Sequence, residues 1–239
     1  MKNELSIIVP ALNEDKNIKP LTLKIIKVLK KKKFEIIIVD DSSTDQSKKI
    51  LLTLSKKYKF FNPILRKKNR DLTQSCFDGI NKSKYQNILI LDADLQHDPK
   101  YIPKMLNELN KGKDIVIGAR KLISGKNKGL SETRRFASIF LIFLFKVFNI
   151  QTKDPMSGFF LFKKNIYFEN KERFFGKGFK ILADFLINSK AKLKTKDITI
   201  NFNRRYESES KMNLRILLIL IQFYIISLFK KILKIIYPY

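Results

Sequence analysis

Residues 88–99 read ILILDADLQHDP and decide the fold that we expect for this chain. The apolar run from Ile88 to Leu91 has the length and the β-branched content of a buried strand, and it ends abruptly at Asp92. Ligands of an open α/β sheet bind outside the carboxyl ends of its strands. The carboxylates of Asp92 and Asp94 therefore stand where such a sheet would bind a ligand.

The two carboxylates are suited to a divalent cation. The alternation of the strand breaks down at its end, so both Asp92 and Asp94 can turn toward one crevice, and Gln96 adds a neutral oxygen nearby. Mg²⁺ and Mn²⁺ are typically held by one or two carboxylates together with substrate phosphates. The motif thus predicts a metal site of Asp92, Asp94 and Gln96. The alternative is that the two aspartates only cap a helix that begins after Pro99.

Strands alternate with helices along the first half of the chain. Short apolar runs predict strands at residues 5–9, 34–39, 62–65, 88–91 and 114–118. Apolar residues at helical spacing predict helices around residues 18–29, 50–54, 72–83 and 100–111, with Ser43 or Thr44 as the N-cap of the second. This order is typical of βαβ units and a mainly parallel sheet. The strand ends at residues 10–14, 40–45 and 92–96 should therefore line one crevice.

The pattern changes after Arg120. Residues 121–130 are polar and glycine-containing and predict a loop, and residues 154–159 lead into a polar connector. Further on, we expect a helix over residues 179–189 and a strand over residues 195–202.

Two later segments, residues 136–150 and 214–229, are intensely hydrophobic. The second holds 16 residues, which reach about 24 Å as a helix, whereas a membrane-spanning helix needs ~20 residues. Because lysines flank these segments, we expect both helices to lie in a membrane interface. A dry core helix for the first and a transmembrane span for the second are the alternatives.

The formal net charge of +27 indicates an anionic partner: phosphate groups, anionic lipid or nucleic acid. A protein that only binds nucleic acid would have no use for a buried strand that ends in two aspartates, so we expect no nucleic-acid partner. The single cysteine, Cys76, excludes an intramolecular disulfide, fits a reducing compartment and is expected to be buried. The acids and the proline around the first apolar run are not typical of a signal peptide.

Seven segments in order carry a family resemblance: IIVPALNE, VDDSSTD, LDADLQHDP, GAR, LSETRRFAS, DPMSGFF and RRYESESKM. Together they resemble the family 2 glycosyltransferases of GT-A fold, in particular the polyprenyl-phosphate glycosyltransferases typified by dolichol-phosphate mannosyltransferase. The resemblance covers nearly the whole chain. It implies a Rossmann-like α/β fold with a nucleotide-sugar-binding core at residues 1–130, an acceptor-binding part of the same domain at 131–211 and a membrane-associated helix at 212–239.

The resemblance also assigns roles by position. The metal, Mg²⁺ or Mn²⁺, would be held by Asp92, Asp94 and Gln96. The implied nucleotide-sugar ligands lie in four of the segments: Pro10, Ala11, Asn13, Glu14, Asp40, Asp41, Asp92, Ala93, Asp94, Arg205 and Lys211. The implied ligands of an acceptor phosphate are Arg120, Arg134 and Ser138. The implied catalytic residues are Asp94, Arg120, Arg134 and Asp154.

Two acidic or basic residues near these motifs are open to a second interpretation. Asp154 could orient Arg134 or another cation, or could simply cap the turn before Pro155. His97, the only histidine, is expected to be structural because Pro99 and a helix start follow it. The chain also departs from the family at residues 71–73, which read DLT where a glycine-rich turn is common, and at Ser208, where glycine is common.

The resemblance implies transfer of a sugar, mannose or glucose, from a GDP- or UDP-linked donor to a polyprenyl phosphate at the cytoplasmic face of a membrane, with inversion. A phosphate acceptor also explains the scarcity of candidate bases, because a phosphomonoester is already anionic at neutral pH and needs placement and charge neutralisation instead. The alternatives are a family 2 enzyme that glycosylates a saccharide hydroxyl, which would want a positioned base, and an inactive relative that only binds membrane or nucleotide.

Overall fold

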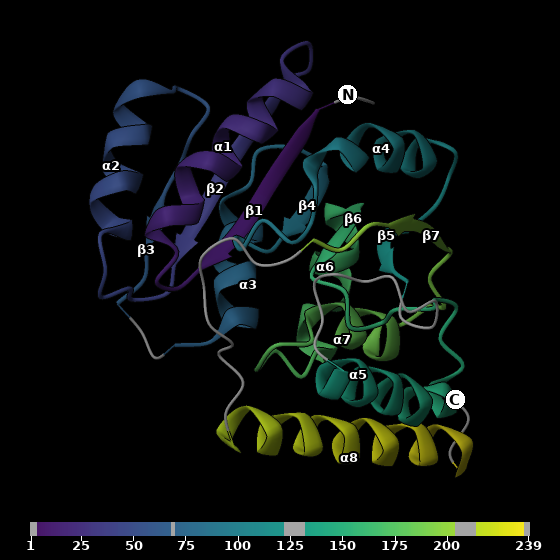
Figure 1. Ribbon diagram of the computed structural model, residues 1–239. Coiled ribbons are helices and arrows are strands. Elements are labelled where there is room, and N and C mark those ends of the chain that lie inside the picture. The colour runs from purple at the N-terminus through teal and green to yellow at the C-terminus, as the bar shows by residue number, and fades with distance from the viewer. Residues whose placement is uncertain (1–3, 68–69, 122–131, 204–213, 237–239) are drawn as a thin grey trace.

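A computed structural model describes residues 4–67, 70–121, 132–203 and 214–236, without the side chains of residues 132–137, 214–216 and 234–236 (Figure 1). A seven-stranded sheet with the order β3-β2-β1-β4-β6-β5-β7 forms its centre. The strands are β1 (Leu5–Ala11), β2 (Phe34–Asp40), β3 (Ile64–Leu65), β4 (Asn87–Leu91), β5 (Ile115–Arg120), β6 (Phe159–Lys163) and β7 (Thr195–Ile200). The expected α/β fold with a mainly parallel sheet is confirmed.

Strand β6 was not predicted. It runs antiparallel to both of its neighbours, β4 and β5, whereas all other pairs in the sheet are parallel. Its apolar residues Phe159–Phe162 directly follow the polar connector, and no turn signal separates the two, so the local pattern predicts no strand there. All four are fully buried, because helices cover the sheet on both sides at this point.

Helices pack on both faces of the sheet. They are α1 (Asp15–Leu29), α2 (Ser47–Lys57), α3 (Leu72–Lys82), α4 (Ile102–Asn110), α5 (Glu132–Phe145), α6 (Lys164–Asn170), α7 (Ile181–Asn188) and α8 (Leu214–Ile236), with short 3₁₀ turns at Pro99–Tyr101, Lys146–Phe148 and Lys171–Arg173. One core lies between the sheet and α1, α2 and α4, and a second lies between the sheet and α3, α6 and α7. Cys76 is buried in the second core, as expected.

The N-cap prediction for α2 was wrong. The helix begins at Ser47, and the side chain of Asp45 accepts a hydrogen bond from the Ser47 amide at 2.9 Å. Ser43 and Thr44 lie further out and bond to Asn13 on the neighbouring loop. A long-range contact between two loops therefore uses the side chains that a local pattern assigned to the helix.

The two hydrophobic segments form α5 and α8, which lie side by side below the sheet in Figure 1. They pack on each other and on α7 through a third cluster that includes Phe145, Ala183, Leu220 and Phe223. Helix α5 is not a dry core helix, since Phe143 is 64% exposed. Helix α8 continues to Ile236, beyond the predicted end. In the described ranges, no helix has both the length and the apolar character needed to cross a membrane.

Candidate functional site

A cavity of about 320 Å³ lies at the carboxyl ends of β1, β2, β4 and β5. Residues from the three predicted strand ends share its wall: Pro10, Ala11, Glu14, Asp41, Asp92, Ala93, Asp94 and Gln96. The parallel order of β2, β1 and β4 brings these ends to one edge of the sheet. The cavity continues past Arg120 to Ser138 of α5 and to the start of α7.

Asp41 is fixed at one end of the cavity by a buried arginine. The Arg66 guanidinium donates to the Asp41 carboxylate, to Ser75 Oγ at 3.0 Å and to the Asp78 carboxylate at 2.9 Å. The Asp71 amide donates to the other Asp41 oxygen at 2.7 Å. Burial raises the pKa of Asp41, and Arg66 and the Asp71 amide oppose that rise. Sequence reasoning missed Arg66, whose one signal was its position at the end of β3.

Asn13 and Asp40, both predicted to bind the nucleotide-sugar, do not line the cavity. Asn13 has a positive φ of 53° and accepts a hydrogen bond from the Thr44 amide at 2.8 Å. Asp40 is buried and accepts from the Ser43 amide at 3.3 Å. Both side chains brace the loops after β1 and β2, so their contribution to the cavity wall is indirect.

The acidic strand end owes its shape to one unusual residue. Leu95 has a φ of 61°, although its side chain is buried in the core. A left-handed residue between Asp94 and Gln96 breaks the strand's alternation, so both neighbours can reach the cavity wall. The Gln96 amide nitrogen donates to Asp94 Oδ1 at 3.2 Å, and the Gln96 side chain donates to the Asn203 carbonyl at 2.9 Å.

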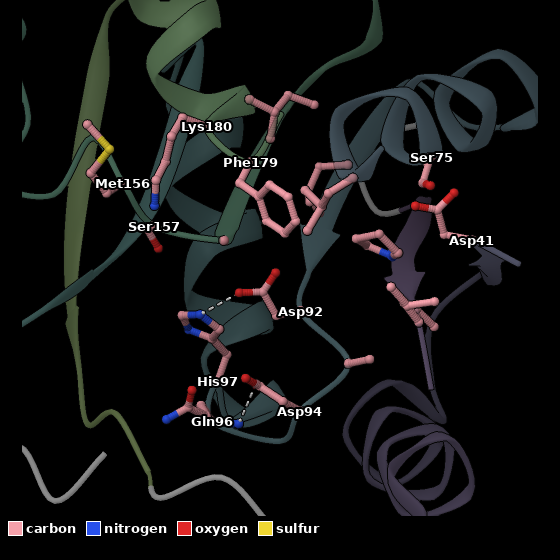
Figure 2. A pocket seen from close by; sticks show the side chains of 18 of the residues that line it. Asp41, Ser75, Asp92, Asp94, Gln96, His97, Met156, Ser157, Phe179 and Lys180 are labelled. Atoms are coloured by element: carbon pink, nitrogen blue, oxygen red, sulfur yellow. Dashed lines mark hydrogen bonds and ion pairs between the residues drawn. The ribbon is translucent and has the colours of Figure 1, made fainter. Parts of the chain in front are cut away.

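Asp92 is held from two sides (Figure 2). His97 is buried against Phe159 and Phe202, and its Nε2 lies 3.5 Å from Asp92 Oδ2. On the other side, a Cβ added to Gly158 would lie only 2.1 Å from the same carboxylate oxygen. The structural role expected for His97 thus includes contact with a predicted metal ligand. The carboxylate itself stays accessible, with 36% of the Asp92 side chain exposed.

The donor set fits a hard divalent cation. Asp92 and Asp94 supply carboxylate oxygens at one wall of the cavity, and Gln96 lies beside them. Among the residues that the structure describes, no cluster of three or more acidic, histidine or cysteine side chains could hold a metal alone. Such a site would need further oxygens from a bound phosphate ligand, which is the usual arrangement for Mg²⁺.

Arg120 is fixed by Asp154. Arg120 Nε lies 2.7 Å from Asp154 Oδ2 and Nη2 lies 2.8 Å from Oδ1, while the Arg120 amide also donates to Oδ2 at 3.1 Å. The guanidinium lies over the ring of Phe202. Burial alone would lower the pKa of Arg120, but Asp154 raises it above its ordinary value. Of the two interpretations of Asp154, the geometry supports the one in which it orients a cation, and this cation is Arg120.

The remaining predicted ligands fall into two groups. Ser138 of α5 lines the cavity, together with the apolar Leu141 one turn later. Arg134 belongs to α5, but its side chain lies outside the described residues, as do Arg205, Ser208 and Lys211 and most of the loop predicted at 121–130.

Lys180 is a cavity residue that sequence reasoning missed. It precedes α7 and lines the wall beside Ser157, Met156 and Phe179. Burial and the nearby Arg120 lower its pKa to about 8, although Asp154 and Asp92 act in the opposite direction. Nothing in the sequence distinguishes Lys180 from the rest of the chain's 49 lysines and arginines.

The chain has Asp71 where the family often has a glycine-rich turn, and the contacts of this side chain explain the difference. Asp71 is the N-cap of α3 and accepts from the Gln74 amide at 3.0 Å through Oδ1. Its Oδ2 accepts from the Gly178 amide at 2.8 Å. A glycine could make neither side-chain contact, so Asp71 ties the start of α3 to the segment that leads to Lys180.

Comparison with known proteins agrees with the resemblance. Residues 6–169 match the family described as glycosyl transferase family 2. The dolichol-phosphate mannosyltransferase of Pyrococcus furiosus is 34% identical over 214 residues, which cover 87% of this chain and 59% of that protein. The dolichol-phosphate mannosyltransferase of Saccharomyces cerevisiae is 32% identical over 227 residues, which cover 91% of this chain and 84% of that protein. The chain thus spans about three fifths of the length of the Pyrococcus relative.

Solved structures show the same fold. Glucosyl-3-phosphoglycerate synthase from Mycobacterium tuberculosis, in complex with Mn²⁺, UDP and glucosyl-3-phosphoglycerate, superimposes with a TM-score of 0.69 at 16% identity. The superposition covers 95% of this chain and 79% of the synthase. The family match covers more than half of the chain and agrees with the motifs and the sheet, and the chain belongs to glycosyltransferase family 2.

Proposed function

We propose that the protein transfers a sugar from a nucleotide-sugar to a polyprenyl phosphate. The observation that carries the proposal is that one cavity joins two chemically different ends. One end has the acids Glu14, Asp41, Asp92 and Asp94, and the other has Arg120 and Lys180 beside apolar residues of α5 and α7. The first end suits a metal-bound diphosphate, and the second suits an anion that carries an apolar chain.

The donor occupies the acidic end. Pro10, Ala11, Glu14 and Asp41 contact the nucleoside, and Asp92, Asp94 and Gln96 would hold Mg²⁺ or Mn²⁺ for the donor's diphosphate. The bound cation supplies positive charge that stabilises the departing nucleoside diphosphate. GDP-mannose and UDP-glucose are the leading donors, and Arg205 and Lys211 are proposed to close over the phosphates.

The acceptor phosphate occupies the other end. The described residues that line this end of the cavity include no carboxylate that could act as a base for a hydroxyl acceptor. Asp154 is engaged by Arg120, and Asp184 accepts hydrogen bonds from the amides of Phe175 and Gly176. A phosphate needs no such base, because it is already anionic near pH 7. Arg120, Arg134 and Ser138 place it for a single in-line displacement with inversion at the sugar carbon.

Helices α5 and α8 bring the protein to the membrane surface. Each exposes large apolar side chains: Ile139, Phe140, Phe143, Leu217, Leu218, Ile221, Ile225, Phe229, Ile232 and Leu233. Lysines accompany them, with Lys146 on the turn after α5 and Lys230 and Lys231 on α8. Such a surface suits peripheral binding to anionic lipid. We place it at the cytoplasmic face, with residues 1–130 as the donor core, 131–211 as the acceptor part and 212–239 as the membrane-associated helix.

A transfer assay tests this function. Purified protein in detergent receives farnesyl phosphate and a panel of radiolabelled UDP- and GDP-sugars, with Mn²⁺, with Mg²⁺ or with EDTA. Asp94→Asn should abolish metal-dependent label in the organic phase. Asp98→Asn is the matched control, because Asp98 lies in the same segment and caps the turn at Pro99 without lining the cavity.

The outcomes separate the candidate functions. Label in the lipid fraction that EDTA removes supports the proposal, and NMR of the product should show an inverted linkage. Metal-dependent donor binding without a lipid product would instead point to a saccharide acceptor. Absence of both donor binding and transfer would indicate an inactive relative.

A further inference from the structure

The proposed function places Lys180 at the acceptor end of the cavity but assigns it no ligand of its own. The residue lies directly before α7, and its aliphatic stem passes Phe179 and Met156 into the cavity (Figure 2). Its nitrogen points toward Ser157, on the wall that also carries Arg120. The side chain is half-buried, so its charge is only partly hydrated.

The ammonium group has no direct counter-ion among the side chains that the structure describes. In residues 4–67, 70–121, 138–203 and 217–233, whose side chains the structure describes, no hydrogen bond or ion pair is formed by Lys180 Nζ. Two other buried cations are paired: Arg66 is bound to Asp41 and Asp78, and Arg120 is bound to Asp154. A partly buried charge without a partner is costly, and an anionic ligand at this position would relieve that cost.

The segment before Lys180 is held on both sides. From α3, the Gln74 side chain donates to the Gly176 carbonyl at 2.6 Å, and Thr73 Oγ1 donates to the Gly178 carbonyl at 2.9 Å. From α7, the Asp184 carboxylate accepts from the Gly176 amide at 2.9 Å. Gly176 and Gly178 have φ values of 70° and 85°, which a side chain would disfavour. The lysine is therefore placed by a braced turn.

We propose that Lys180 binds the phosphate group of the acceptor, in the part of the cavity that Arg120 also lines. This inference rests on the proposed function and names a ligand within it. An acceptor phosphate carries a charge of about −1.5 to −2 near pH 7. Arg120 cannot balance that charge alone, because Asp154 already neutralises it. The donor diphosphate has its own counter-charge in the metal, so Lys180, whose charge interacts with Arg120, is left for the acceptor.

Kinetics of a charge-removing variant test the assignment. Lys180→Met keeps the length of the apolar stem and removes the ammonium. We expect the KM for farnesyl phosphate to rise about 10- to 100-fold, the effect of losing one charge-assisted hydrogen bond, while the KM for the donor stays within about twofold. Lys177→Met is the control: it removes an exposed lysine from the same segment and should leave both constants unchanged. Lys180→Arg should retain part of the affinity for the acceptor.

Binding of the lipid without a donor gives a second readout. Wild-type protein should bind farnesyl phosphate more tightly than farnesol, and Lys180→Met should lose this preference while its affinity for farnesol is kept. This comparison needs no turnover, so it tests Lys180 even where the wild type transfers no sugar and the proposed function fails. A variant that keeps the phosphate preference, or in which only the donor KM rises, would overturn the assignment. If Lys180→Met does not fold, the same measurements on Lys180→Arg and Lys180→Gln decide the question.

Discussion

Arg120 and Asp154 join the end of β5 to the connector before β6 through two parallel hydrogen bonds of 2.7 and 2.8 Å. The Asp154 carboxylate is 0% exposed, and it also accepts from the Arg120 backbone amide. The guanidinium is thus fixed in direction before any ligand arrives, so a phosphate at the cavity wall would meet a preformed cation.

Asp154→Asn should weaken both stability and transfer. Asparagine keeps the shape of the side chain but leaves the Arg120 charge buried without its counter-ion. Loss of one partner from a buried ion pair costs about 3–5 kcal/mol, so we expect the free energy of unfolding in urea to fall by about 3 kcal/mol. The KM for the acceptor should rise as well, because Asp154 no longer fixes the Arg120 guanidinium. Asp197→Asn is the control, because Asp197 accepts hydrogen bonds from Thr152 and Lys153 and does not line the cavity. An unchanged acceptor KM in Asp154→Asn would contradict a positioning role for Asp154.

Much of the fold followed from local patterns. The apolar runs that became β1, β2, β4 and β5 are each bounded by polar or turn residues, so their lengths were visible in the sequence. Strand β6 was not, since its partners β4 and β5 are distant in the chain and its start adjoins a polar connector. Only the sheet that surrounds it shows why its phenylalanines are buried.

Gly158→Ala should impair the metal-binding wall. The new methyl group would lie 2.1 Å from Asp92 Oδ2, so the Asp92 carboxylate would have to move. A displacement of about 1 Å in a catalytic site can reduce turnover about 10²-fold, and we expect a loss of that size in metal-dependent transfer. The free energy of unfolding should fall by only about 1–3 kcal/mol, the usual cost of overpacking. Titration with Mn²⁺ should show that the variant needs a higher Mn²⁺ concentration than the wild type for half-maximal transfer.

Gly112→Ala provides the control for this substitution. Gly112 has a φ of 88° and no atom within 4 Å of an added Cβ, so alanine there strains the backbone without touching the cavity. We expect a stability loss of about 1 kcal/mol with unchanged transfer. Equal activities for Gly158→Ala and the wild type would show that Asp92 needs no fixed position.

Lys180 should make stability depend on pH above neutrality. Its pKa is about 8 in the folded protein, where Arg120, Asp154 and Asp92 face it, against an ordinary value of 10.5. Between these pH values the unfolded chain binds a proton that the folded protein has released, so the free energy of unfolding rises with pH across this window. Lys180→Met removes the group, and at pH 7 we expect it to be more stable than the wild type by about 1–3 kcal/mol.

That gain should disappear as the pH rises from 8 to 10.5. Urea unfolding of the two proteins at several pH values measures the difference directly, and other titrating groups cancel in the comparison. Lys177→Met, at an exposed lysine, should show no such pH-dependent difference. A constant gap between wild type and Lys180→Met across the window would contradict a lowered pKa.

The candidate site was predicted where its signal is local. The acids after β4 follow an apolar run directly, and they line the cavity. Arg66 and Lys180 gave no local signal, because lysine and arginine are common in this chain and only packing makes Arg66 buried and Lys180 half-buried. Asn13 and Asp40 show the reverse: both sit at strand ends, yet loop hydrogen bonds turn them away from the cavity wall.

Removal of exposed aromatic residues from α5 and α8 should weaken membrane binding. Phe143 and Phe229 are each 64% exposed, one on each helix. Burial of one such side chain contributes about 1.5–3 kcal/mol, so replacing both by glutamate should reduce partition onto anionic vesicles at least about 100-fold. Co-sedimentation with vesicles of phosphatidylglycerol and phosphatidylcholine measures the partition.

The control variant combines Leu23→Glu with Leu52→Glu. It changes two exposed apolar residues on α1 and α2, which lie across the molecule in Figure 1, and it should bind vesicles as the wild type does. Both double variants should still transfer sugar to farnesyl phosphate in detergent, because none of the four residues lines the cavity.

If the wild type and both double variants bound vesicles equally, the membrane contact would have to lie elsewhere than on α5 and α8.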